Sequence, residues 1–125
     1  MSPTVRSTQG FALQHWSGGS HAHVVAASGE LDLQAAPELR NLLVQLMELG
    51  ERELVVDLSE ATFIDSTTIG VFAGRQRQLR DVDGELRLVC SNPDLLRTLD
   101  ISGMARVFRV HPTLSEALAA AREGS

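Results

Sequence analysis

Four consecutive residues that could bind or react stand where an apolar run ends. The segment "ELVVDLSEATFI" leads directly into "DSTT", which comprises Asp65, Ser66, Thr67 and Thr68. The residues that follow, "IGVFAG", open a stretch with the apolar spacing of a helix. Because the first N–H groups of a helix have no partner within it, Asp65 or Ser66 can accept from them as an N-cap.

The same position could also carry a phosphate. Free N–H groups and the positive end of the helix dipole both favour an anion there. A phosphoryl group on Ser66 would add about −1.5 to −2 charges next to Asp65. We expect such a group to change the electrostatic field seen by a docked partner without unfolding the domain. The residues alone leave a simple cap and a modification site both open.

The sequence supports a catalytic site or a metal site less well than it supports a cap or a modification site. A serine enzyme needs a base near Ser66, and the chain contains neither a "GxSxG" nor a "GxxxxGK[ST]" motif. The histidines are His15, His21, His23 and His111, and "HAH" would place His21 and His23 on one strand face, where they could hold a metal. No carboxylate or cysteine stands at ligand spacing, so we expect a solvated face, no metal and no cofactor.

Composition indicates an ordinary globular protein. The chain has 125 residues, is 43% hydrophobic and carries a net charge of −5, which disfavours direct binding to nucleic acid. The single cysteine, Cys90, lies in the apolar run "LRLVC" and is expected to be a buried, inert thiol. No signal peptide and no apolar run of about 20 residues occur. We therefore expect a cytoplasmic protein that does not enter a membrane.

The pattern of elements predicts an α/β domain. Residues 10–16 and 21–31 read as an N-terminal antiparallel hairpin, and strands and helices then alternate. Such alternation predicts a mostly parallel (mixed) sheet of about 4–5 strands with about four helices. Residues 1–8 are expected to form a flexible tail and residues 9–122 a single domain. Local signals mark the ends of three helices. Pro37 suits the first turn of one helix, which has the apolar stripe Leu39, Leu42, Leu43, Leu46 and Met47 and ends at Gly50. Asn92 and Pro93 begin the next as cap and first residue, and Thr113 and Glu116 form the capping box of the last.

Two further features lie near "DSTT" in this scheme. Glu30 and Asp32 of "GELD" end the second strand, and they would approach Ser66 if that strand neighbours residues 53–58. Gly70 and Gly74 share one side of the second helix. We expect them to permit close packing against the sheet, with packing against a partner as the alternative.

The order of these motifs resembles the STAS domain, and more narrowly the bacterial anti-sigma factor antagonists. The resemblance covers about residues 9–121 and is carried by "GELD", by "DLSEATFIDST" before a helix, and by "LDISGM..VF" before the last strand. It implies a STAS fold and a regulatory protein that is not an enzyme.

The resemblance also implies a mechanism. Antagonists of this family bind an anti-sigma factor, usually a serine/threonine kinase of the GHKL type, and thereby free a sigma factor. The kinase phosphorylates the residue after the aspartate, which releases the antagonist, and a phosphatase resets it. Matched by motif, the acceptor is Ser66, with Thr67 and Thr68 as alternatives, and Asp65 precedes it. The partner-binding residues would be Glu30, Asp32, Asp65, Ser66, Thr67, Thr68 and Gly70, on a monomer or weak homodimer.

One position departs from the family pattern. Thr68 stands where "DSSG" or "DSTG" motifs have glycine, and its branched side chain would lie where a partner backbone approaches. The alternative function is therefore a STAS scaffold that is never phosphorylated and that oligomerises or binds a small ligand.

Overall fold

The computed structural model describes residues 4–8, 10–19, 22–104 and 106–123. Seven strands and four helices lie within these residues. The strands are β1 (Thr4–Thr8), β2 (Phe11–Ser17), β3 (His23–Leu31), β4 (Glu53–Asp57), β5 (Ala61–Ile64), β6 (Glu85–Val89) and β7 (Arg109–His111). The helices are α1 (Ala35–Glu48), α2 (Ser66–Arg80), α3 (Pro93–Ile101) and α4 (Leu114–Arg122). None of these helices is both long and apolar enough to span a lipid bilayer.

The strands form one mixed sheet in the order β1-β2-β3-β4-β6-β7. The pairs β1–β2 and β2–β3 are antiparallel, whereas β3–β4, β4–β6 and β6–β7 are parallel. Strand β5 also pairs with β3, beyond the segment of β3 that pairs with β4. Strands β4 and β5 thus share one position beside β3. The predicted α/β class and the N-terminal hairpin are confirmed.

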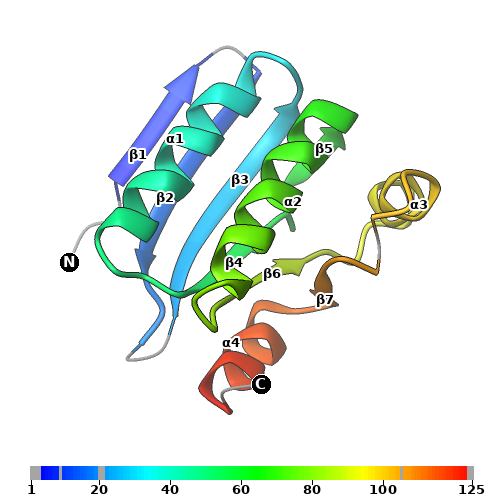
Figure 1. The fold of residues 1–125 in the computed structure, drawn as a ribbon. Coiled ribbons are helices and arrows are strands. Elements are labelled where there is room, and N and C mark those ends of the chain that lie inside the picture. The colour runs from blue at the N-terminus through cyan, green and yellow to red at the C-terminus, as the bar shows by residue number, and fades with distance from the viewer. Residues whose placement is uncertain (1–3, 9, 20–21, 105, 124–125) are drawn as a thin grey trace.

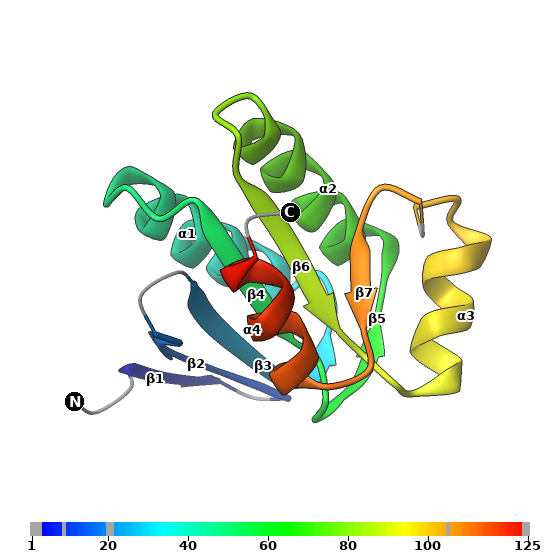
Figure 2. The ribbon, with the colours of Figure 1, turned by 90° about the horizontal axis from the view of Figure 1, so that it is seen from below.

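The helices cover the two faces of the sheet unequally. Helices α1 and α2 lie side by side on one face (Figure 1), and α4 lies on the other, while α3 stands beside β5 and β7 (Figure 2). The larger apolar core lies beneath α1 and α2, and a smaller one beneath α4. The smaller core comprises Ala22, Val24, Val55, Val89, Ala117 and Ala121. Both α1 and α2 begin at the same edge of the sheet, where β3 and β5 end (Figure 1).

Local sequence signals explain where the helices begin and end. The predicted stripe of α1 faces the core, and Gly50 adopts the positive φ of +95° that follows many helices. The Asn92 side chain accepts from the Asp94 N–H at 2.8 Å at the start of α3. The Thr113 hydroxyl accepts from the Glu116 N–H at 3.1 Å at the start of α4. These predicted caps are confirmed.

The sheet departs from prediction in its strand count. Seven strands replace the expected four or five, because residues 4–8, expected in a flexible tail, form β1 and pair along β2. Threonine and valine favour strands, and β1 satisfies backbone groups that β2 would otherwise expose. Strand β5 was also not predicted, and the last strand, β7, comprises only Arg109–His111.

Candidate functional site

The first turn of α2 is held by two side chains of "DSTT". Asp65 is the N-cap, and its Oδ1 accepts a hydrogen bond from the Thr68 N–H at 2.9 Å. Thr68 is fully buried, and its hydroxyl donates to the Leu31 carbonyl at 2.8 Å. The Asp65 N–H donates to the same carbonyl at 3.2 Å. The end of β3 therefore fixes the start of α2.

Ser66 and Thr67 present their side chains to solvent. They are the first two residues of α2, and both are exposed. Their N–H groups have no acceptor within the helix, because they belong to its first turn. The first turn contains no acidic residue of its own, so Asp65 supplies the nearest carboxylate along the chain. Two accessible hydroxyl groups thus stand at the positive end of a 15-residue helix.

The "GELD" segment reaches the same edge. Leu31 pairs with Ile64, and its carbonyl is the one that Asp65 and Thr68 bind, so Asp32 directly follows the point of contact. Asp32 starts the turn into α1: its Oδ1 accepts from the Gln34 N–H at 3.0 Å. Glu30 is exposed on β3. The structure therefore brings the ends of β3 and β5 together, whereas the sequence predicted only that β3 neighbours residues 53–58.

Glycine at position 29 makes this arrangement possible. Gly29 has φ +82°, and a Cβ there would lie 2.2 Å from the Gly10 carbonyl oxygen. The register between β3 and β5 shifts at Gly29 and Glu30, and the Glu30 N–H donates to the Gly10 carbonyl at 2.7 Å. Only glycine fits both the backbone and the close approach. The first letter of "GELD" is thus a structural requirement of the site.

Two exposed apolar side chains lie close in sequence to the site residues, and the sequence patterns did not predict them. Phe63 is 48% exposed on β5, opposite Glu30, and Leu33 is 68% exposed after Asp32. Large exposed apolar groups next to polar ones are typical of protein interfaces. In the strand "ATFI", Ala61 and Ile64 are buried, whereas Thr62 and Phe63 between them are exposed.

Gly70 and Gly74 do not pack against the sheet. A Cβ added at either position would meet no other atom within 4 Å. The expectation of close packing to the sheet is wrong, because the inward side of α2 is formed by other residues. These inward residues are Thr68, Ile69, Phe72, Ala73, Gln76 and Leu79. The glycines instead leave an open strip along α2 that starts one turn from Ser66.

Known proteins resemble this chain along most of its length. The sequence model of the STAS domain matches residues 18–117. The anti-sigma-B factor antagonist of Bacillus subtilis (strain 168) is 35% identical over 86 residues, which is 69% of this chain and 78% of that protein. The chain is a STAS domain of the anti-sigma factor antagonist family. This confirms the resemblance inferred from the motifs.

Solved structures agree with this assignment. An anti-sigma factor antagonist from Mycobacterium paratuberculosis superposes on this STAS domain with a TM-score of 0.82 at 27% identity, covering 90% of this chain and 94% of that one. The Bacillus cell fate determinant SpoIIAA in its phosphorylated form has the same fold, with a TM-score of 0.68 at 24% identity, covering 86% and 97%.

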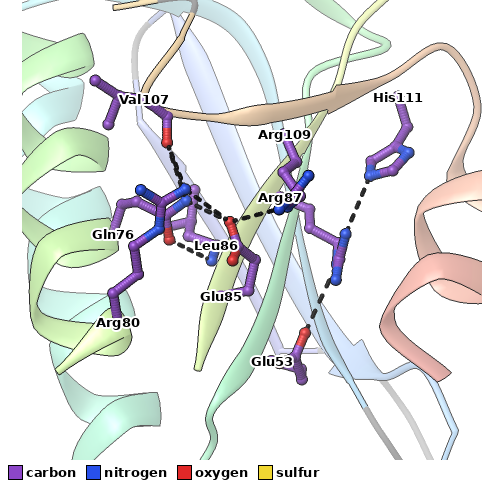
Figure 3. Close-up of polar contacts among 9 residues, drawn as sticks. All are labelled: Glu53, Gln76, Arg80, Glu85, Leu86, Arg87, Val107, Arg109 and His111. Carbon is purple, nitrogen blue, oxygen red and sulfur yellow. Dashed lines mark hydrogen bonds and ion pairs between the residues drawn. The ribbon is translucent and has the colours of Figure 1, made fainter. Parts of the chain in front are cut away.

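A second polar region of the STAS domain lies at the opposite ends of the strands and centres on β6. The Gln76 side chain donates to Glu85 Oε2 at 2.6 Å and accepts from the Leu86 N–H at 2.7 Å (Figure 3). Arg80 donates to the Val107 carbonyl at 3.2 Å and approaches Glu85 at 3.4 Å. These bonds join α2 to β6 and to the segment before β7.

Arg87 extends this region to the other face of the sheet. Its side chain is 1% exposed and lies 3.6 Å from Glu53 Oε1 and 3.4 Å from His111 Nε2 (Figure 3). Burial raises the pKa of Glu53, although the Arg87 charge opposes that shift. Burial, followed by the Arg87 charge, lowers the pKa of His111. The pattern "ELRLV" offered no sign that an arginine would be buried.

Cys90 behaves as expected from sequence. It is buried, and burial raises the pKa of its thiol. A thiol with a raised pKa is a poor nucleophile at neutral pH. Among the described residues, no group of three or more histidine, cysteine or acidic side chains is placed to hold a metal ion.

Proposed function

We propose that this protein binds an anti-sigma factor that is also a GHKL-type serine/threonine kinase, and that this binding frees a sigma factor. Phosphorylation of Ser66 then releases the antagonist, and a phosphatase restores it. The observation that carries the proposal is an exposed serine at the first position of α2, directly after the Asp65 cap, in a member of the anti-sigma factor antagonist family. The role is regulatory rather than catalytic, and such a partner places the protein in the cytoplasm.

Burial distinguishes among the three candidate acceptors. A kinase must reach the hydroxyl oxygen, and Thr68 is fully buried with its hydroxyl donating to Leu31. Thr68 would have to leave the core to be phosphorylated. Ser66 and Thr67 are both exposed. Ser66 is preferred because it matches the family position directly after the aspartate, and Thr67 remains the alternative.

The proposed partner surface combines charge, apolar area and open helix. Ser66, Thr67 and Gly70 are exposed on α2, and Phe63 and Leu33 are exposed apolar residues that lie close in sequence to Asp65 and Asp32. Glu30, Asp32 and Asp65 supply the acidic rim. A partner with complementary basic groups at its edge and apolar groups at its centre would fit such a surface.

Release follows from unpaired charge. A phosphoryl group on Ser66 would bring about −1.5 to −2 charges beside Asp65, on a surface that must be desolvated in the complex. Burying a charge without a partner costs about 2–5 kcal/mol. The Asp65 cap and the Thr68 bond hold the first turn in place, so the fold is expected to persist after modification.

The scaffold alternative was based mainly on Thr68. Thr68 was expected to project toward a partner and to alter the surface relative to glycine-containing relatives. In the structure Thr68 points inward to Leu31 and is 0% exposed, so it cannot reshape the contact surface. No other observation favours a scaffold over a phosphorylated antagonist.

A pull-down from lysate of the source organism tests the proposal. Wild type, Ser66→Ala, Ser66→Asp and Ser115→Asp serve as baits, with phosphopeptide mapping of the native protein in parallel. Ser115 is a matched control, because it is exposed in the first turn of α4. We expect an anti-sigma factor kinase on every bait except Ser66→Asp, and phosphate on Ser66. Equal retention of the same proteins by all four baits would overturn the proposal.

A further inference from the structure

Two histidines converge on the face of the sheet beneath α1. His15 on β2 and His23 on β3 are diagonal neighbours, because His15 pairs with Val25 and His23 pairs with Ser17. The Nδ1 atom of His15 lies 2.9 Å from the Nε2 atom of His23. The two rings have centroids 5.2 Å apart and are tilted by 36°. The two ring nitrogens therefore face one another across the hairpin.

This separation suits a shared metal ion as well as a shared proton. Metal–nitrogen bonds to histidine are about 2.0–2.1 Å long, so two nitrogens at roughly a right angle around one ion lie about 2.9 Å apart. Right-angled nitrogen and oxygen ligands are typical of Cu²⁺ and Ni²⁺. A tetrahedral ion such as Zn²⁺ would require the rings to separate by a few tenths of an ångström.

Glu51 lies on the far side of the His23 ring. Its Oε2 is 3.8 Å from Nδ1 of His23, which is the nitrogen that faces away from His15. This carboxylate therefore lies on the side of the ring opposite the nitrogen that faces His15. Histidines that bind metals are commonly oriented in this way by a carboxylate.

Open space adjoins His15. A cavity of about 300 Å³ borders His15 beneath the last turns of α1. It is lined by His15, Leu42, Gln45, Leu46, Glu48 and Leu49. Glu48 and Gln45 bring a carboxylate and an amide to the same cavity, and its volume accommodates the water molecules that would complete the coordination of an ion held by two protein ligands.

We propose that His15 and His23 together bind one divalent transition metal ion of the Cu²⁺ or Ni²⁺ type, with Glu51 positioning His23. The proposal departs from the expectation of no metal, which considered His21 and His23 as the pair. His21 lies outside the described residues. Bound metal would join β2 to β3 without involving Ser66, so the proposal is independent of the phosphorylation switch.

Titration calorimetry with NiCl₂ tests the site. Wild type is compared with His15→Gln, His23→Gln and the matched control His21→Gln, each first checked for folding by two-dimensional NMR. We expect one ion per chain, at least tenfold weaker binding in His15→Gln and in His23→Gln, and unchanged binding in His21→Gln. Glu51→Gln should weaken Ni²⁺ binding less than either histidine variant, because both proposed ligands are still present. Retention of wild-type affinity in His15→Gln, or its loss in His21→Gln, would overturn the assignment.

Electron paramagnetic resonance of the Cu²⁺-loaded chain gives a spectroscopic measurement that is independent of the calorimetry. Coordination by two imidazole nitrogens is expected in the wild type. A spectrum with one nitrogen or none, or one unchanged in the double variant His15→Gln/His23→Gln, would show that the pair is joined by a hydrogen bond only.

Discussion

The first turn of α2 and the Glu85–Arg87 region hold polar side chains under opposite conditions. At α2, Ser66 and Thr67 are exposed, and their N–H groups have no acceptor within the helix. Around β6, Glu85 and Arg87 are buried and contact partners from α2, β4 and β7. Paired polar groups inside a protein stabilise one arrangement, whereas unpaired groups at its surface remain available to a partner. Under the proposed function, the ends of β3 and β5 serve binding, and the buried contacts of β4, β6 and β7 serve stability.

The largest effect should follow from breaking the buried pair. Arg87→Ala leaves Glu53 in a partly buried position without its cation and opens a cavity under α4. We expect unfolding in urea to show a loss of about 3–5 kcal/mol. Arg87→Met, which keeps the volume and removes the charge, should lose less. A change below about 1 kcal/mol for Arg87→Ala would contradict the structural role of this region.

Thr68 is buried, although Ser66 and Thr67 directly before it are exposed. Thr68→Val keeps the shape and removes the hydroxyl that donates to Leu31, so we expect a loss of about 1–2 kcal/mol in the free energy of unfolding. Thr68→Ser keeps the hydroxyl and should preserve the bond. Chemical denaturation measures both variants. Partner affinity of the folded Thr68→Val variant should stay within about twofold, and a larger change would place Thr68 on the binding surface.

Gly70→Ala should change the stability of the protein and its affinity for a partner in opposite directions. Gly70→Ala meets no atom within 4 Å and replaces a poor helix former, so thermal unfolding should show a gain of about 0.5–1 kcal/mol. Partner affinity should fall, because the added methyl group occupies the open strip. Gly74→Ala, one turn farther from Ser66, is the matched control and should affect binding less. Unchanged affinity in Gly70→Ala would remove this strip from the interface.

The smallest effect concerns pH. The folded pKa of His111 is lowered, so the unfolded state takes up a proton first as pH falls. The stability that neutral His111 contributes is complete above its ordinary pKa of 6.5 and is lost as pH falls through the folded value. We therefore expect the melting temperature to fall with pH over that window. His111→Gln should flatten the profile, and an equal slope in that variant would assign the effect to other groups.

Sequence predicted the features whose causes are local. The stripe of α1, the caps at Asp65, Asn92 and Thr113, and the alternation of elements all depend on residues close together in the chain. The motif order also predicted the family and placed Ser66 at the start of a helix.

What sequence missed depends on contacts between distant segments. Thr68 is buried against the end of β3, where it bonds to Leu31, a residue that lies 37 positions earlier in the chain. Arg87 is buried because β4 and β7 bring Glu53 and His111 to it. The His15–His23 contact depends on the register of a hairpin, and Gly70 is open because no other element packs over that side of α2. Patterns along the chain do not encode these pairings.

Strand β3 has a consequence for hydrogen exchange. It bonds to β2 on one side and to β4 and β5 on the other, so most of its amides can exchange with solvent only when several strands separate at once. We expect β3 to exchange among the slowest segments and the edge strands β1 and β7 among the fastest. Because the Leu31 carbonyl at its end holds both Asp65 and Thr68, the turn that carries Ser66 is attached to the part of the domain that opens least often. A kinase or phosphatase would therefore meet this serine on a surface of nearly constant shape.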